Sequence, residues 1–146
     1  VRLNAAVKMP ISGGEQYTTL ERFEPCLQRG AYGIVQPDAG MCGITEAMRI
    51  GRRAHEFGVD LCPHNWHNGL MTMANAHLVA ALPNPRVLEL CRIQGPLQWA
   101  ILKEPPVIQS GWLELPDRPG LGVELAEDLE ERFPYIDGPY AIRLER

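Results

Sequence analysis

The sequence lacks the features that would assign the chain to a membrane, to nucleic acid or to an oxidising compartment. No run of about 20 apolar residues occurs, which argues against a membrane-spanning helix. The 14 lysine and arginine residues are outnumbered by 18 aspartate and glutamate residues, so the chain has no basic field that would bind nucleic acid. No signal-peptide pattern is present, and the cysteines form no C-x-x-C pair, which favours reduced thiols in a cytoplasmic protein. These cysteines are Cys26, Cys42, Cys62 and Cys91.

The chain of 146 residues is long enough for one compact domain with a core of its own, and too short for two. It does not begin with methionine, and residues 1–7 resemble the end of a helix. We therefore expect the chain to be a piece of a longer protein.

Three units of similar layout follow one another, each with a short apolar run, a polar loop and a helical pattern. Such alternation predicts parallel strands covered by helices, and therefore an α/β fold. The expected helices span 18–28, 44–57 and 70–82, and a fourth apolar run at 86–90 predicts a further buried strand. Beyond Cys91 the alternation stops. There we expect a short helix within 94–103, a hairpin within 107–115, a helix over 124–133 and a last strand within 135–146.

Each of the four predicted strands is followed by, or ends in, a side chain that can take part in acid–base or metal chemistry. Because the carboxyl ends of parallel strands meet at one edge, functional residues of such folds gather there. Taken singly, each of these residues has an ordinary interpretation as a helix cap or a turn residue. Taken together, three carboxylates and an imidazole suit a hard divalent cation and acid–base catalysis. The four residues are Glu15, Asp38, His64 and Glu89.

The stretch 61–85 contains no aspartate, glutamate, lysine or arginine, but it contains three histidines and four asparagines. This composition predicts a buried interior with a polar site. His64 and His67 form an H-x-x-H pair, but they lie in a loop with no third ligand nearby in the sequence, so zinc is not favoured. Glu89 lies in a predicted buried strand, where a carboxylate is unfavourable unless it is paired or used.

The motifs around Glu15, Asp38, His64 and Glu89, in this order along the chain, resemble those of the enolase superfamily, and within it the mandelate racemase subgroup. The resemblance covers nearly all of the chain but only the second half of a family member. It implies that 1–95 form the second half of a modified TIM (β/α) barrel, and that 96–146 form a C-terminal segment that packs on the barrel and on a capping domain. The capping domain and the early strands would then lie outside this chain. The motifs that carry the resemblance are Gly13-Gly14-Glu15, 36–40 with 43–47, Pro63-His64, Leu88-Glu89 and 119–125.

The resemblance implies Mg²⁺-dependent abstraction of the proton α to a carboxylate, with an acid sugar or another hydroxy-acid as the small-molecule substrate. Glu15 corresponds to the third metal ligand of the family. Asp38 and His64 correspond to the Asp–His dyad after the sixth and seventh strands. Glu89 corresponds to the acid at the end of the eighth strand, which hydrogen-bonds the substrate carboxylate. An aspartate behind an imidazole fixes its tautomer and raises its basicity, which agrees with this assignment.

Dehydration of an acid sugar to a 2-keto-3-deoxy acid is the favoured reaction. Racemisation or epimerisation of a 2-hydroxy acid at the same site is an alternative, and so is a non-catalytic assembly domain with vestigial site residues. A related subgroup has a lysine after the sixth strand, whereas this chain has Asp38 there and contains only Lys8 and Lys103.

The other two metal ligands of the family and its lysine base would lie outside this chain, so the chain alone is expected to be inactive. Half a barrel leaves two open sheet edges. A homo-oligomer or a complementary N-terminal half is therefore the expected partner.

Overall fold

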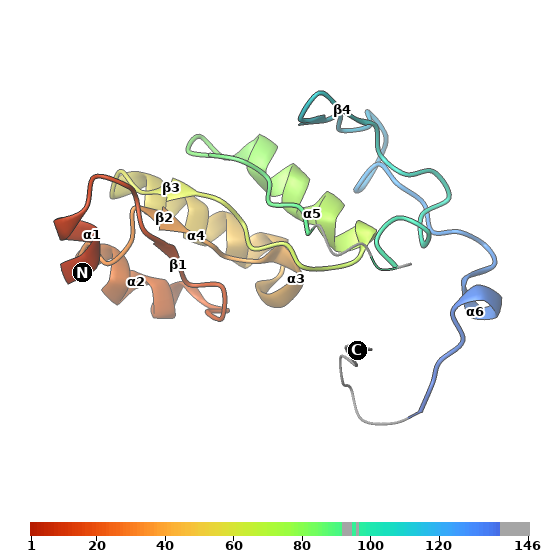
Figure 1. Ribbon diagram of the computed structural model, residues 1–146, viewed down its shortest axis with the longest axis horizontal. Helices are drawn as coiled ribbons and strands as arrows, with labels where there is room; N and C mark the ends of the chain where they lie inside the picture. Colours follow the sequence, from red (N-terminus) through yellow and green to blue (C-terminus); the bar gives the residue numbers. More distant parts are fainter. Residues whose placement is uncertain (92–94, 96, 138–146) are drawn as a thin grey trace.

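The computed structural model describes residues 1–91, 95 and 97–137 in an elongated molecule (Figure 1). The β/α units occupy one end, and the hairpin and last helix occupy the other. Within the described ranges, no helix has the length and apolar character needed to cross a membrane. The helices are α1 (Arg2–Ala6), α2 (Leu20–Gln28), α3 (Ala39–Cys42), α4 (Ile44–Glu56), α5 (Gly69–Ala81) and α6 (Leu129–Arg132). The strands are β1 (Ser12–Gly13), β2 (Ile34–Val35), β3 (Asp60–Leu61), β4 (Ile108–Gln109) and β5 (Trp112–Leu113).

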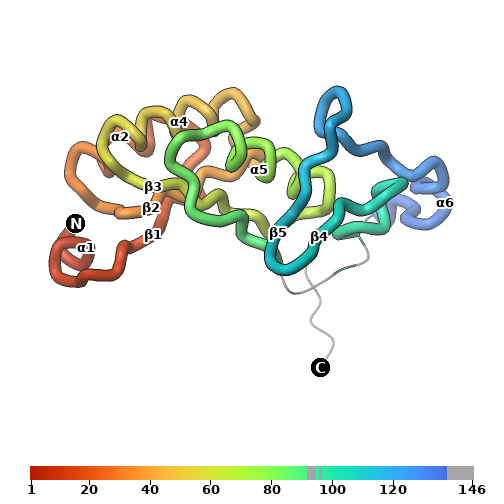
Figure 2. The backbone as a smooth tube through the Cα atoms, turned by 90° about the horizontal axis from the view of Figure 1, so that it is seen from above, coloured from red at the N-terminus to blue at the C-terminus, as the bar shows by residue number. Residues whose placement is uncertain are grey.

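The first three strands form a parallel sheet in the order β1-β2-β3, which confirms the predicted α/β fold. In this register Ile34 lies between Ser12 and Asp60, and Val35 lies between Gly13 and Leu61. Parallel neighbours require a crossover connection, and the expected helices α2 and α4 provide the two crossovers. Figure 2 shows these two helices along the same side of the sheet.

The predicted strand at 86–90 is only partly formed, and this expectation is corrected. Its start lies parallel to β3, because the Leu61 N–H donates to the Asn84 carbonyl and the Arg86 N–H donates to the Leu61 carbonyl, both at 2.8 Å. Pro85, between them, has no N–H to add to a ladder. The single bridge joins Leu61 to Pro85, one residue before the predicted strand, and Arg86 and Val87 are exposed rather than buried.

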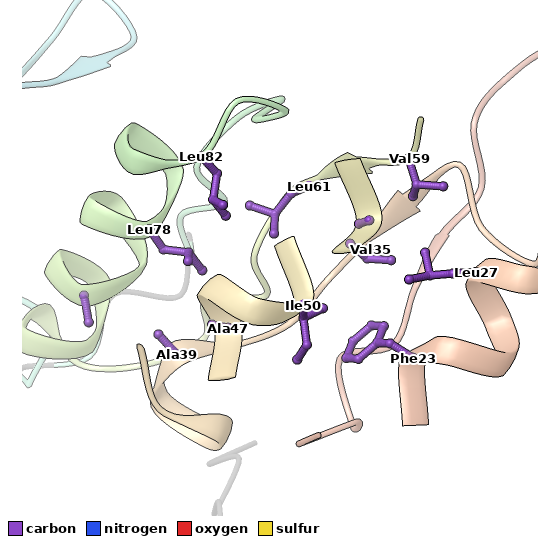
Figure 3. Packing of buried hydrophobic residues seen from close by; sticks show 12 residues of the cluster. Phe23, Leu27, Val35, Ala39, Ala47, Ile50, Val59, Leu61, Leu78 and Leu82 are labelled. Atoms are coloured by element: carbon purple, nitrogen blue, oxygen red, sulfur yellow. The ribbon is translucent and has the colours of Figure 1, made fainter. Parts of the chain in front are cut away.

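The core fills the space between the sheet and the helices (Figure 3). Helix α4 buries Ala47, Ile50, Gly51 and Ala54, a spacing of three and four that places them on one face. The Ile50 side chain is fully buried with Phe23 of α2 and Val35 of β2 in the same cluster. Helix α5 is apolar almost all round and buries residues on several sides. Burial of these side chains is the main force that fixes the strands in register.

The C-terminal part agrees with the sequence in its hairpin and differs in its helices. Strands β4 and β5 form the predicted hairpin. The helix expected over 124–133 is reduced to α6, because Glu124 and Ala126 hydrogen-bond in extended conformation to Lys103 and Ile101. Residues 97–101 of the expected helix within 94–103 form turns, while 92–94 and 96 lie outside the described residues. Most of the expected last strand, 138–146, also lies outside them.

Truncation of the central core residue is expected to destabilise the protein strongly. Ile50→Ala should lower the free energy of unfolding by about 2–4 kcal/mol, because it removes buried methyl groups and leaves a cavity. Ile44→Ala on the same helix is the matched control, since Ile44 is 43% exposed, and should cost less than about 0.5 kcal/mol. Urea unfolding of both variants measures the difference. Equal losses would contradict the burial described for α4.

Candidate active site

The carboxyl ends of the parallel strands bring two sequence-predicted residues into direct contact. Asp38 follows β2 and caps α3, where its Oδ1 accepts a 2.8 Å hydrogen bond from the Gly40 N–H. His64 follows β3, and its Nδ1 lies 2.8 Å from Asp38 Oδ2. The contact expected between Asp38 and His64 is therefore present.

A second imidazole shares the same carboxylate oxygen. His67 Nε2 lies 2.6 Å from Asp38 Oδ2, and the two imidazole rings meet edge to face with their centroids 6.1 Å apart. In the sequence His67 is only half of an H-x-x-H pair with no third ligand nearby. The structure corrects that expectation, because Asp38 lies beside both histidines.

The distances in this cluster are those of hydrogen bonds. A zinc ion bound at about 2.0–2.1 Å to both a nitrogen and an oxygen would keep these two atoms roughly 3 Å or more apart. Here the two nitrogen–oxygen separations are 2.6 and 2.8 Å. Asp38, His64 and His67 therefore form a hydrogen-bonded triad, and we keep that name for them.

Asp38 is ionised although its side chain has no exposed surface. Burial raises the pKa of Asp38, but hydrogen bonds from His64, Gly40 and Asn75, together with the charge of His67, outweigh burial and lower this pKa below its ordinary value of 3.8. An ionised carboxylate can only accept hydrogen bonds, so both imidazole nitrogens must donate to it. A neutral His64 that donates from Nδ1 has its lone pair on Nε2, which is the arrangement of a general base.

Buried asparagines connect the triad to the surrounding elements. Asn75 of α5 accepts a 2.9 Å hydrogen bond from the Ala39 N–H, and its Nδ2 lies 3.2 Å from both Asp38 Oδ1 and the His64 carbonyl. Asn65 Nδ2 donates to the Glu89 carbonyl at 2.7 Å. The charge-free stretch 61–85 signalled such a polar interior, but its sequence did not show which asparagine contacts which acid.

Glu89 joins the site through Trp66. Trp66 Nε1 donates a 3.1 Å hydrogen bond to Glu89 Oε1, and the Trp66 ring stacks near the His64 ring with centroids 6.5 Å apart. The other oxygen, Glu89 Oε2, is buried and has no hydrogen-bond partner among the described residues. A buried oxygen of this kind needs a hydrogen-bond partner, so it marks a position where a donor from a ligand is favoured.

Among the described residues, Glu15 has no hydrogen bond or ion pair with the other three predicted site residues. It is an exposed residue two positions after β1 and, within the part of the chain that the structure describes, has neither a hydrogen bond nor an ion pair. An unpaired carboxylate oxygen at this edge fits a hard cation such as Mg²⁺. One carboxylate alone does not bind Mg²⁺ strongly, because this ion needs several oxygen ligands to lose its waters.

A sizeable cavity of the described residues lies away from the triad. A cavity of about 640 Å³ lies between α5 and the hairpin, lined by apolar residues that include Val79, Val87 and Trp112. None of the four sequence-predicted site residues lines it.

A family model described as enolase C-terminal domain-like matches residues 1–129. The chain belongs to this family. The fold is accordingly the C-terminal half of a TIM barrel of the enolase superfamily, as the sequence motifs indicated.

Two curated relatives are similar in sequence to most of this chain. D-galactarolactone cycloisomerase of Agrobacterium fabrum is 33% identical over 93% of this chain and 38% of its own length. Arabinonate dehydratase of Saccharolobus solfataricus is 35% identical over 90% of this chain and 35% of its own length. The chain therefore spans little more than a third of either relative.

A mandelate racemase/muconate lactonizing enzyme from Sulfitobacter superposes with a TM-score of 0.85 at 31% identity, over 99% of this chain and 36% of that one. An enolase from Agrobacterium radiobacter, bound to sodium and L-malate, gives a TM-score of 0.83 at 30% identity, over 98% of this chain and 40% of that one. The resemblance to the mandelate racemase subgroup is thus confirmed.

Because the pKa of Asp38 is lowered in the folded protein, the free energy of unfolding depends on pH in the acidic range. The unfolded chain binds this proton more readily than the folded one, so the stabilisation is fully present above the ordinary pKa of 3.8 and is lost as pH falls through the folded-state value. We expect the free energy of unfolding to fall below about pH 4, and Asp38→Asn to flatten that part of the curve.

Urea unfolding at a series of pH values measures this slope, with Asp117→Asn, at an exposed loop position, as the matched control. An unchanged slope in Asp38→Asn would contradict the hydrogen-bonding of the carboxylate described above.

Proposed function

We propose that this chain supplies one half of a metal-dependent active site that removes the proton α to the carboxylate of an acid sugar. The proposed reaction is dehydration to a 2-keto-3-deoxy acid. The observation that carries the proposal is the contact between His64 Nδ1 and the buried Asp38 carboxylate, which leaves His64 Nε2 as a base. The rest of the barrel and a capping domain complete the site, with 1–95 in the barrel and 96–146 as the segment that reaches the capping domain.

In this mechanism His64 Nε2 accepts the α-proton, and Asp38 stabilises the resulting imidazolium through the Nδ1–H hydrogen bond. The same imidazolium then returns a proton to the departing β-hydroxide, which leaves as water. The α-carbon–hydrogen and β-carbon–oxygen bonds break, a carbon–carbon double bond forms, and the enol product becomes the 2-keto-3-deoxy acid. One imidazole can serve both steps only if it stays on the same face of the substrate throughout. The hydrogen bond from His64 to buried Asp38 holds the imidazole in that position.

Glu15 and Glu89 have different proposed roles. Glu15 would donate an oxygen ligand to Mg²⁺, and the bound ion supplies positive charge that stabilises the negative charge developing on the substrate carboxylate. Glu89 would hydrogen-bond that carboxylate as charge develops, and its unpartnered Oε2 atom supports this role. The sodium ion and L-malate in the Agrobacterium radiobacter enolase support the same ligand chemistry, a hard cation with a hydroxy-acid.

The reactions named for the relatives favour dehydration and leave isomerisation as the alternative. Arabinonate, D-xylonate and L-rhamnonate dehydratases are among them, which supports an acid-sugar dehydratase. D-galactarolactone cycloisomerase is another relative, so isomerisation that begins with the same proton abstraction is the second candidate. The two differ in product mass, because dehydration removes one water and isomerisation removes nothing.

The function is tested by incubating the complete protein with a panel of acid sugars and Mg²⁺ and detecting products by mass spectrometry. Loss of water and a 2-keto-3-deoxy product are expected with at least one acid sugar. His64→Asn should lower kcat by about 10²–10⁴-fold with little change in metal affinity, because it removes a positioned base. Exposed His55, changed to Asn, is the matched control. Activity of His64→Asn within a few-fold of wild type would overturn the assigned role, and no turnover of any acid sugar would favour a non-catalytic assembly domain.

The two glutamates should respond differently to metal. Glu15→Gln should weaken Mg²⁺ binding, and part of its lost activity should return at high Mg²⁺, because a carboxylate ligand has been replaced by an amide. Glu89→Gln keeps a neutral donor of similar shape, so it should retain the metal and lower kcat without rescue. Calorimetric Mg²⁺ titration and kinetics at low and saturating metal separate the two roles. The opposite pattern would contradict the assignment of both residues.

A further inference from the structure

We propose that His67 is a positioning residue that controls the protonation of His64 by sharing one oxygen of the Asp38 carboxylate. This inference rests on the proposed role of His64 as the base. It adds a second imidazole to the site, one that does not touch the substrate and acts only through Asp38.

The hydrogen bonds of Asp38 show why the sharing matters. Its Oδ1 atom accepts from Gly40 and Asn75, and its Oδ2 atom accepts from both histidines. A carboxylate offers about four acceptor positions, so all of them are occupied. The His67 contact, at 2.6 Å, is the shortest of the four and therefore competes directly with His64 for the charge on Oδ2.

Charge balance gives the direction of the effect. Asp38 supplies one negative charge to two imidazoles, so it can stabilise only one imidazolium well. A hydrogen bond from His67 disperses the charge on Oδ2 and weakens the attraction between Asp38 and a protonated His64. His67 thus offsets part of the stabilisation that Asp38 gives to a protonated His64.

The other ionisable groups near His64 and His67 do not take over the effect of His67 on His64. Burial and the neighbouring Asp38 raise the pKa of the Cys42 thiol, and burial and Glu89 raise that of Cys62, so both thiols are neutral near pH 7. Glu89 reaches the pair through Trp66, whose ring stacks near His64. On α5 the residue that faces the triad is the neutral Asn75, while His77 contacts the Leu121 carbonyl instead.

The chain fixes His67 where this interaction requires it. His67 directly precedes Asn68, whose side chain caps α5 by accepting a 3.1 Å hydrogen bond from the Met71 N–H. His67 Nε2 also lies 2.9 Å from the position that a Cβ would occupy at Gly40, so a larger residue there would meet the ring. Both ends of the His67 interaction are thus held by capped helices, α3 and α5.

The test compares two substitutions at His67 in the complete protein. His67→Leu removes the donor and fills the space, so the acid limb of the kcat/KM profile should move to higher pH by about one unit. His67→Gln places an amide N–H near the position of Nε2, so the limb should stay within about 0.3 unit of wild type. His55→Gln is the control for loss of an exposed imidazole. An acid limb that His67→Leu leaves in place, or a limb that both substitutions move equally, would overturn the proposal.

A spectroscopic readout keeps the test valid if His67→Leu does not fold or if no substrate is turned over. In ¹⁵N-histidine spectra of the wild-type protein, His64 should carry its proton on Nδ1 and His67 on Nε2, with assignments from His64→Asn and His67→Gln. A His67 proton on Nδ1 would overturn the proposal. If these tautomers are observed but no acid sugar is turned over, the inference about His67 stands and the proposed function is rejected. If an acid sugar is turned over but the acid limb of His67→Leu does not move, the proposed function stands and the inference is rejected.

Discussion

A charge buried away from water must be surrounded by donors, and in this chain that requirement falls on Asp38. Its side chain has no exposed surface, yet its lowered pKa keeps it ionised. Isolated burial of a carboxylate is strongly unfavourable, so the protein supplies a donor for each acceptor position. The donors come from α3, from α5 and from the loop between β3 and α5. The arrangement of these three segments is therefore tied to one carboxylate.

The rest of the fold keeps that carboxylate in place. The apolar cluster between the sheet and α2, α4 and α5 sets the register of the strands, and the strands end where Asp38 and His64 begin their loops. Asn75 lies on the buried face of α5, so packing of that helix also positions a donor for Asp38. A change in the core would consequently reach the site through α5 without touching Asp38 or His64. Catalysis at such a site depends on hydrogen-bond partners that are already in position, and not on the base alone.

The one-sided apolar spacing of α2 and α4 and the apolar run of α5 were enough to predict these three helices, and their alternation with short apolar runs was enough to predict the parallel sheet. The Asp38–His64 contact was also predictable, since both residues follow neighbouring parallel strands. The His67 contact was not, because a loop residue can point in many directions and its spacing from His64 suggested a different chemistry. The helix expected over 124–133 failed for a similar reason: pairing of 124–126 with 101–103 overrides local helix propensity, and no local pattern reports such a long-range contact.

We propose that Asp38 and His64 form the base of a site whose cation is bound through Glu15. A crystal structure of the complete protein with Mg²⁺ and L-malate, a hydroxy-acid that binds the Agrobacterium radiobacter enolase, tests it most directly. We expect a Glu15 oxygen among the magnesium ligands, His64 Nε2 directed at the α-carbon of the bound acid, and Asp38 Oδ2 on His64 Nδ1. Magnesium bound without Glu15, or His64 turned away from the acid, would contradict it.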